Sequence, residues 1–406
     1  MAPTRPLRIL LSEGASTSAR QAVTALGLAG HEIHVMDPDA HCICRFSRFV
    51  TRVHRCPPIA TDPKAYLAFA LDLLNTGRFD VLLPIHEQGF VFAKAQHRIP
   101  KNVGLALPSF ESYSIALDKA RFSALLAEIG VPQPETRVIP DAARIPLDEF
   151  PYILKRPMST ASRSVQVVRD KGDVEIARKT MSGPGELLVQ EMIDAPVEHA
   201  QTVFDRGRFV AMHCYRRILL GAGGGEALKE SVHRPRVREE IEKIAKRLDW
   251  HGAFSFDYLW RDDTPYFVDS NPRLVEPMSA HFAGLDILGA LLDVSRGLSP
   301  PELLPSRAGV RTRLSLQALL GKALQTRSRW EIVKEICRFM TSSGIYEGSK
   351  EEFTPVKIDW MAFFPVAFTA FAVLSHPGSA RILPALGWGA GLLTSESIRI
   401  IREEIE

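Results

Sequence analysis

Residues 254–273, FSFDYLWRDDTPYFVDSNPR, contain two apolar runs that carry polar side chains at set positions. Strand side chains alternate between the two faces of a sheet, so Asp269 and Asn271 point the same way. If residues 262–264 connect two antiparallel strands, Asp257 lies directly opposite Asp269. Like charges in directly opposite positions destabilise a sheet, and a divalent cation between the carboxylates would reverse that effect. Mg²⁺ prefers such oxygen ligands and shares its sites with substrate phosphates, so we predict a magnesium–nucleotide site here.

Length and composition set the broad class of the chain. Its 406 residues allow two or three domains with large cores, and a charged fraction of 24% is typical of soluble globular proteins. A net charge of +3 at pH 7 gives no indication of nucleic acid as a partner. Five cysteines without regular spacing argue against a disulfide framework and indicate a reducing, cytoplasmic compartment. The spacing of His41, Cys42, Cys44, His54 and Cys56 fits no zinc template.

The first 107 residues alternate between strand-like and helix-like segments. We expect strands at 7–11, 32–36 and 81–85 and helices at 19–28 and 66–74, an order that predicts a doubly wound α/β domain. The first run has strand length and no cleavage pattern, which argues against a signal peptide. The loop at 12–18 has one glycine where a dinucleotide-binding fingerprint needs three. We therefore expect this domain to be a scaffold and a wall for the acceptor substrate.

Two lysines occupy positions that suit phosphate binding. Asp118 is the predicted cap of a helix, which puts Lys119 in the first turn, where a cation opposes the helix dipole. Either Lys119 is solvated, or a bound phosphate compensates for the repulsion. Lys155 ends an apolar strand before a loop of small polar residues at 159–164. It is either an edge lysine that extends to water or a point charge for phosphate.

Four segments, taken in order, resemble the ATP-grasp superfamily. They are LDKARFSALLAEIGVPQPET at 117–136, PYILKRP at 151–157, LLVQEMIDAPVEH at 187–199 and FSFDYLW…YFVDSNPR at 254–273. The resemblance covers about residues 7–300 and is to the branch of carbamoyl phosphate synthetase large subunits, D-alanine–D-alanine ligases and amino-acid ligases.

The resemblance implies an α/β chain with an α+β C-terminal part. Its expected parts are a pre-ATP-grasp domain at 1–107, an ATP-grasp domain at 108–305, and a helical, apolar C-terminal extension at 306–406. Within the ATP-grasp domain, the small lobe would span about 135–195 and the large lobe about 196–305.

The resemblance also implies roles on the nucleotide side of the site. Lys119 and Lys155 are similar to the two lysines that hold the ATP phosphates. The backbone of Glu191 and Ile193 would contact the adenine edge, with Gln190 near the adenine amino group. Gln190 stands where an acid is frequent in the family.

Further implied roles concern the ribose, the metal and the chemical step. Glu198 resembles the carboxylate that binds the ribose hydroxyls. Asp257 and Asp269 resemble the carboxylates that bind Mg²⁺, or Mn²⁺ in its place, with Asn271 as their partner. Arg273 would lie over the transferring phosphate or the acyl phosphate, as a catalytic residue together with Lys155.

The chain departs from the family pattern in several places. The loop at 159–164 has hydroxyls and an arginine where glycines are usual, and the second metal acid is Asp269 where glutamate is usual. The tripeptide at 194–196 replaces a glycine turn, which leaves the alignment of Glu198 open by one residue. One of the two arginines at 216 and 217 would face phosphate or the carboxylate substrate, and Arg217 is the candidate.

The glycine-rich run at 221–229, GAGGGEALK, resembles a lid that excludes water from the acyl phosphate, the alternative being an ordinary linker. The implied reaction is ATP-dependent activation of a carboxylate as an acyl phosphate, followed by attack of an amine or a thiol. Two other classes stay open: a carboxylase or kinase of the same superfamily, and a non-catalytic ATP-binding or scaffold protein, associated with a membrane in one version. The expected partners are small-molecule carboxylate and amine substrates and further copies of the chain.

The resemblance ends near residue 305. Two amphipathic helices are expected at 314–323 and 330–340, followed by apolar runs at 360–375 and 382–393. The first run falls short of the ~20 apolar residues that a spanning helix needs. The region 360–393 is therefore either a core hairpin or an oligomer interface, or a peripheral anchor at the inner face of the membrane. The residues expected near a membrane interface are Trp360, Arg381, Trp388 and Arg399.

Overall fold

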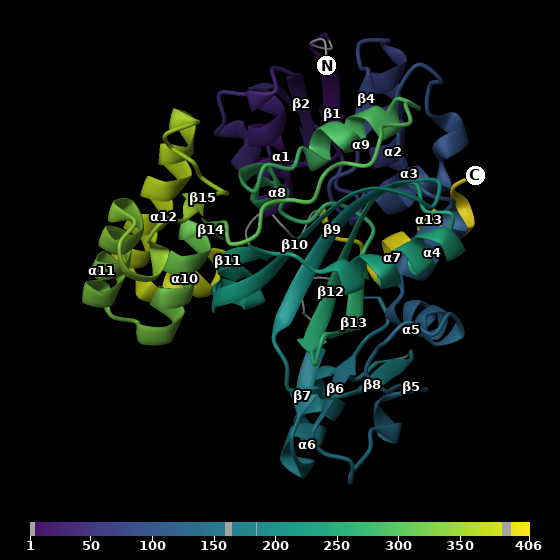
Figure 1. Ribbon diagram of the computed structural model, residues 1–406, viewed down its shortest axis with the longest axis vertical. Coiled ribbons are helices and arrows are strands. Elements are labelled where there is room, and N and C mark those ends of the chain that lie inside the picture. The colour runs from purple at the N-terminus through teal and green to yellow at the C-terminus, as the bar shows by residue number, and fades with distance from the viewer. Residues whose placement is uncertain (1–4, 159–164, 184, 384–390) are drawn as a thin grey trace.

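The computed structural model describes residues 5–158, 165–183, 185–383 and 391–406. The described residues form three β-sheets with helices on their faces (Figure 1). The predicted α/β class is confirmed. No helix of the described chain is long and apolar enough to cross a membrane.

The N-terminal sheet has the strand order β3-β2-β1-β4 in the described chain, and its strands are parallel. Its strands are β1 (Arg8–Leu11), β2 (Glu32–Asp37), β3 (Val50–Arg55) and β4 (Val81–Leu83). Its main helices are α1 (Thr17–Leu28), α2 (Pro63–Asn75) and α3 (Gly89–Lys94). The core residues of α1 pack on one face, and those of α2 and α3 pack on the other. The domain is doubly wound, as predicted.

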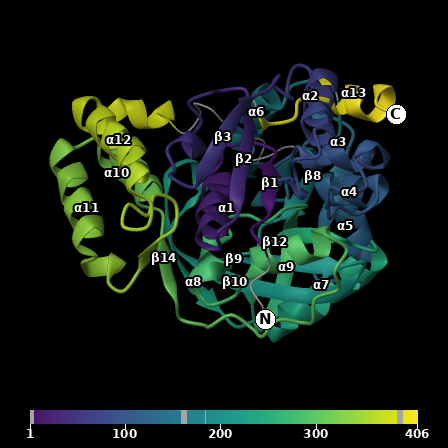
Figure 2. The same cartoon turned by 90° about the horizontal axis from the view of Figure 1, so that it is seen from above.

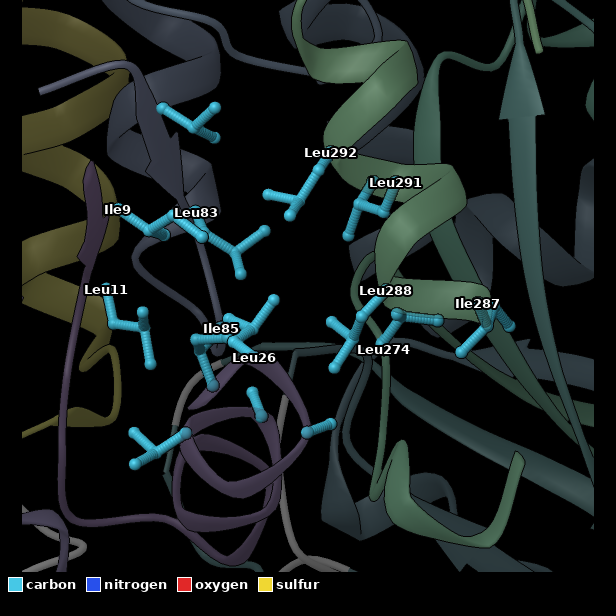
Figure 3. Packing of buried hydrophobic residues seen from close by; sticks show 14 of the residues in the cluster. Ile9, Leu11, Leu26, Leu83, Ile85, Leu274, Ile287, Leu288, Leu291 and Leu292 are labelled. Carbon is cyan, nitrogen blue, oxygen red and sulfur yellow. The ribbon is translucent and has the colours of Figure 1, made fainter. Parts of the chain in front are cut away.

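A shared apolar core joins this domain to the following one. Figure 3 shows Ile9, Leu11 and Leu83 facing Leu288 and Leu292 of α9 (Ile287–Ser295). These leucines and isoleucines are buried, so the two domains have one continuous core here. This contact fixes the ends of β1, β2 and β4 beside the larger sheet.

The largest sheet of the described chain has the order β13-β12-β9-β10-β11-β14-β15. Its strands are β9 (Val197–Asp205), β10 (Arg208–Leu220), β11 (Glu226–Val232), β12 (Gly252–Arg261), β13 (Thr264–Asn271), β14 (Arg311–Arg313) and β15 (Lys350–Glu351). β14 and β15 lie beyond residue 305, where the ATP-grasp pattern was expected to end. They extend the sheet past β11, which would otherwise be an unpaired edge.

The third sheet has the order β5-β8-β6-β7 and lies in the region predicted as the small lobe. Its strands are β5 (Thr136–Ile139), β6 (Tyr152–Lys155), β7 (Val165–Val168) and β8 (Leu187–Glu191), with α6 (Lys171–Thr180) packed on them. The loop at 159–164, which the sequence suggested as a phosphate contact, lies outside the described residues.

The C-terminal region is mainly helical, as expected. It contains α10 (Ser315–Thr326), α11 (Arg329–Thr341), α12 (Phe363–Ser375) and α13 (Ser395–Glu404). The first three gather at one edge of the molecule in both views (Figures 1 and 2), and α13 returns to α2 and α3 of the N-terminal domain. Residues 384–390, including Trp388 of the predicted interface set, lie outside the described residues.

Candidate functional site

The hairpin of β12 and β13 carries the two predicted metal carboxylates. Its turn is formed by Asp262 and Asp263, both with positive φ, and Asp257 is paired with Asp269 across the strands. The predicted pairing of the two acids is confirmed, although Thr264 belongs to β13 and not to the connection as expected. Paired residues on adjacent strands present their side chains to the same face, so the two carboxylates belong to one site.

A β-bulge makes this arrangement possible. Tyr258 pairs with Phe267, while Asp257 pairs with Asp269, which leaves Val268 as an extra residue in β13. In a regular strand without the bulge, Asp269 would lie on the same face as the buried Phe267, two residues before it. The bulge shifts the alternation by one position and directs Asp269 away from the core. No feature of the sequence had indicated the bulge.

Each carboxylate has a cationic partner from the protein itself. His199 Nδ1 is 2.8 Å from Asp257 Oδ1, and Lys119 Nζ is 3.2 Å from Asp269 Oδ1. The repulsion between the two acids is therefore relieved by the protein's own cations, and a bound divalent ion is not needed for that purpose. No group of three or more His, Cys, Asp or Glu side chains in the described ranges is arranged to hold a metal. A magnesium ion at this pair would need nucleotide oxygens and water to complete its shell.

His199 is the functional candidate that the sequence reasoning missed. It lies on β9, and its Nε2 forms a second ion pair, 2.9 Å long, with Glu226 of β11. Burial opposes charging of the ring, but Glu226 and Asp257 outweigh it and raise the pKa of His199 to about 10. The ring also stacks on Tyr215, with centroids 4.9 Å apart. An imidazolium therefore holds Asp257 in place.

Glu198 does not have the position expected of a ribose ligand. Both of its oxygens accept hydrogen bonds from Arg234, at 2.7 and 2.6 Å, and the Tyr258 hydroxyl donates to it at 3.1 Å. It is buried on the face of the sheet opposite His199. The ribose prediction is wrong, because strand alternation puts residue 199 rather than 198 on the site face.

The two lysines reach the pair of carboxylates from different elements. Lys119 is the first residue of α5 (Lys119–Glu128), and Asp118 caps that helix by accepting from two backbone N–H groups. Lys155 ends β6 and donates to Gln190 Oε1 at 2.6 Å and to the carbonyl of the bulge residue Val268 at 3.2 Å. Burial lowers the pKa of Lys155 to about 8. The structure thus brings together the residues predicted to hold phosphates and metal.

The strand expected to contact adenine is only partly available to a ligand. The Glu191 N–H donates to the Glu135 carbonyl at 2.8 Å, so it is already used within the protein. Gln190 donates to Thr136 Oγ1 at 2.9 Å and accepts from Lys155, and the side chain of Ile193 is buried. The adenine contact through the backbone of Glu191 and Ile193, with Gln190 near the amino group, stays a prediction, and the N–H of Glu191 is not available for it.

The neighbouring arginines 216 and 217 of β10 point to opposite faces of the sheet. Arg216 forms an ion pair with Glu230 at 2.7 Å, whereas Arg217 alternates to the face of Tyr215 and is paired across the strands with Lys229. This favours Arg217 over Arg216 as the residue that faces the site.

Arg273 follows β13 and is 8% exposed, and within the described chain its Nε has no hydrogen-bond partner. A buried guanidinium with spare donors suits an anion. The role predicted for Asn271 is not tested by any contact, although it is paired with Ser255 on the same hairpin.

The glycine-rich run at 221–229 is not a lid. β11 begins at Glu226, and Ala222 is buried in a cluster with α10. Gly223 and Gly224 have φ values of 61° and 85°, so the glycines serve the turn geometry. Lys229 is fully buried between Glu276 and Glu352. The sequence suggested mobility because it did not show that α10 covers this turn.

Comparison with known proteins agrees with this geometry. Residues 116–277 match the ATP-grasp domain family, and this segment of the chain is an ATP-grasp domain. The chain is 27% identical over 210 residues to the carbamoyl phosphate synthase large chain of Thermus thermophilus, which is 47% of this chain and 20% of the relative. The chain thus spans about a fifth of the length of the curated relatives it matches.

Solved structures with the same fold include two enzymes. Biotin carboxylase from Campylobacter jejuni superposes with a TM-score of 0.58 and 20% identity, covering 75% of this chain and 74% of that one. The L-amino acid ligase from Bacillus licheniformis has a TM-score of 0.58 and 17% identity, covering 74% and 76%. The predicted ATP-grasp fold and its resemblance to carbamoyl phosphate synthetase are confirmed.

Proposed function

We propose that this protein is an ATP-dependent ligase that activates a carboxylate as an acyl phosphate and transfers the acyl group to an amine, with a thiol as the alternative nucleophile. The observation that carries the proposal is the convergence of Lys119, Lys155, Asp257 and Asp269 on one hairpin. Cations and paired carboxylates at this position form a site for a magnesium-bound triphosphate.

The main barrier in such a reaction is electrostatic, because a carboxylate must approach a phosphoryl group that is also anionic. Lys119 and Lys155 would neutralise phosphate oxygens, and the unpartnered Nε–H of the buried Arg273 would donate to the charge that develops on the transferring group. Asp257 and Asp269 would hold Mg²⁺, with Mn²⁺ as a substitute, since their oxygens are hard donors. The ion, when bound, supplies charge neutralisation between the phosphates. Fixed positions for all of these groups lower the cost of orienting the reactants.

The acceptor substrate would approach from the N-terminal domain. A small pocket that opens to solvent lies at the carboxyl ends of β1, β2 and β4, the usual position of ligands in such sheets. It is lined in part by Glu13, Asp37 and Tyr66. Burial raises the pKa of Glu13, and nearby Arg273 opposes that rise. This proximity supports the expectation that the domain forms a wall of the acceptor site.

The experiment that tests the proposal is ADP release from the purified chain with ATP and Mg²⁺. Pools of carboxylates are tested with and without pools of amines and thiols, and the Asp269→Ala variant is the matched control. ADP formation that requires both a carboxylate and a nucleophile supports ligation. Turnover with bicarbonate alone indicates a carboxylase, a phosphorylated product without a nucleophile indicates a kinase, and nucleotide binding without turnover under any condition indicates a scaffold.

A further inference from the structure

One face of α12, together with Trp360 in the short helical turn that precedes it, exposes large aromatic side chains to solvent. Trp360, Phe363, Phe364, Phe368 and Phe371 are between 48% and 73% exposed, and we call them the aromatic face. Residues 360, 364, 368 and 371 are three or four positions apart, so they lie on one side of the helix. A cluster of this kind on a single short helix marks a contact surface rather than scattered exposure.

The core of the protein does not need the aromatic face. The other side of α12 packs against α10 and α11, where Val373 is fully buried. Asp359, just before the aromatic face, forms a fully buried ion pair with Arg20 of α1 at 2.8 Å. The helix is therefore held firmly from behind while its aromatic side chains point outward.

The stretch of chain that carries the aromatic face has no acidic side chain, and exposed arginines flank the face. Residues 360–394 contain no Asp or Glu. On one flank, the ring of Phe46 lies 6.4 Å from that of Phe364, which puts the exposed Arg45 and Arg48 beside the first turn of α12. The exposed Arg381 ends the short helical turn that packs on α12. A cationic rim around an aromatic surface complements an anionic surface that also offers an apolar layer.

We propose that the aromatic face docks this protein on the surface of an anionic lipid bilayer, with α12 lying in the plane of the interface. Trp and Phe partition into the interfacial layer, and arginines beside them bind anionic headgroups. A helix of 13 residues is about 20 Å long, which suits a position along the interface. In Figures 1 and 2 this helix lies at an edge of the molecule, together with α11. The proposal is independent of the ligase activity.

A second copy of the chain is a poorer occupant of this surface. A twofold contact would place the arginine-rich rim of one copy near that of the other, and the stretch 360–394 offers no carboxylate to pair with them. Like charges across an interface cost binding energy. An anionic bilayer meets the same aromatic side chains without that repulsion.

The test measures how much of the full-length chain sediments with lipid vesicles. Phosphatidylcholine vesicles are compared with vesicles that contain about 30% phosphatidylglycerol. The variant Phe368→Ser/Phe371→Ser should lower the partition coefficient on anionic vesicles by about tenfold or more, because two exposed apolar side chains are removed. Leu304→Ser is the matched control, since Leu304 is 86% exposed elsewhere, and it should bind as the wild type does. Arg45→Gln/Arg48→Gln should reduce binding to anionic vesicles and make it less sensitive to salt.

Several outcomes would overturn the proposal. One is the absence of wild-type binding to anionic vesicles. Another is equal binding by the wild type and the double phenylalanine variant, with circular dichroism showing that both are folded. A third is light scattering that reveals a dimer which the phenylalanine variant abolishes, without vesicle binding, because the aromatic face would then be a self-association surface.

Discussion

The ion pairs of His199 give the sharpest prediction about the site. Replacing His199 with Gln removes a cation that lies 2.8 Å from Asp257 and 2.9 Å from Glu226. The Glu226 carboxylate is buried and the Asp257 side chain is 33% exposed, and neither has another positive partner at that distance within the described residues. The variant should therefore be less stable, and Asp257 should be less well positioned for a bound metal.

The size of the effect follows from the pKa. The rise in the pKa of His199 from 6.5 to about 10 corresponds to roughly 5 kcal/mol of stability at ~1.4 kcal/mol per pKa unit. Breaking a buried ion pair by removing one partner costs about 3–5 kcal/mol, so His199→Gln should lose a similar amount at pH 6. The amide nitrogen of glutamine reaches the position of Nε2 and can donate one hydrogen bond to Glu226, which keeps the loss near the lower end of that range.

The pH dependence has a definite sign. The pKa of His199 is raised in the folded state, so its contribution is fully present below pH 6.5 and is lost as the pH rises toward 10. Burial opposes ionisation of Glu226, but His199 outweighs it and lowers the pKa to about 2, so that contribution is present above pH 4.5 and is lost as the pH falls. The difference in unfolding free energy between wild type and variant should be greatest between pH 4.5 and 6.5.

Urea unfolding of both proteins at pH 5.5, 8 and 10, followed by circular dichroism, measures this difference. His41→Gln is the control, because His41 is exposed and its replacement should change nothing at any pH. A His199→Gln variant whose stability loss is the same at pH 5.5 and 10 would show that the ring is neutral in the folded protein. The account of Asp257 as a carboxylate held by an imidazolium would then be refuted.

Three further predictions concern the nucleotide site. Asp269→Ala and Asn271→Ala should each abolish ADP release while the circular dichroism spectrum is unchanged, and turnover by both would remove the metal assignment. Lys155→Ala should raise the dissociation constant for ADP, measured by calorimetry, by about 10- to 100-fold, since it removes a charge-assisted phosphate contact. A variant that binds ADP as tightly as the wild type would count against that contact. Glu198→Gln should lower the unfolding free energy by a few kcal/mol, because it weakens the buried ion pair with Arg234. The same variant should keep its affinity for ADP within about twofold of the wild type. A loss of ADP affinity without a loss of stability would restore the ribose role of Glu198.

The fold could be predicted from the sequence because local signals for strands, turns and helix caps agree with the order of these elements along the chain. Alternating apolar strands and helices gave the doubly wound N-terminal domain, and the short turn at Asp262 and Asp263 defined the hairpin of β12 and β13. The helix cap at Asp118 placed Lys119 correctly. These features depend on residues that are adjacent in the sequence, so they can be read from a single sequence.

The errors occurred where position depends on one residue of register or on distant packing. Strand alternation alone cannot tell whether Glu198 or His199 faces the site. The turn before β9 determines which of two consecutive residues points to the site face. The extra Val268 in β13 has no signature in its side chain, because the bulge is set by the pairing with β12. The turn at 221–225 was assigned mobility because α10, which covers it, comes about 90 residues later.

The C-terminal region supports strand β11, which carries Glu226 next to the site. Lys229 on β11 is fully buried between Glu276, which follows the β13 hairpin, and Glu352, which follows β15. Burial disfavours the charged form of Lys229, but the two glutamates outweigh it and keep the pKa of Lys229 above its usual value. A buried ammonium whose partner is missing is strongly destabilising. A chain that ends near residue 305 would therefore leave a charge without one of its partners on the strand that also carries Glu226, the second partner of His199.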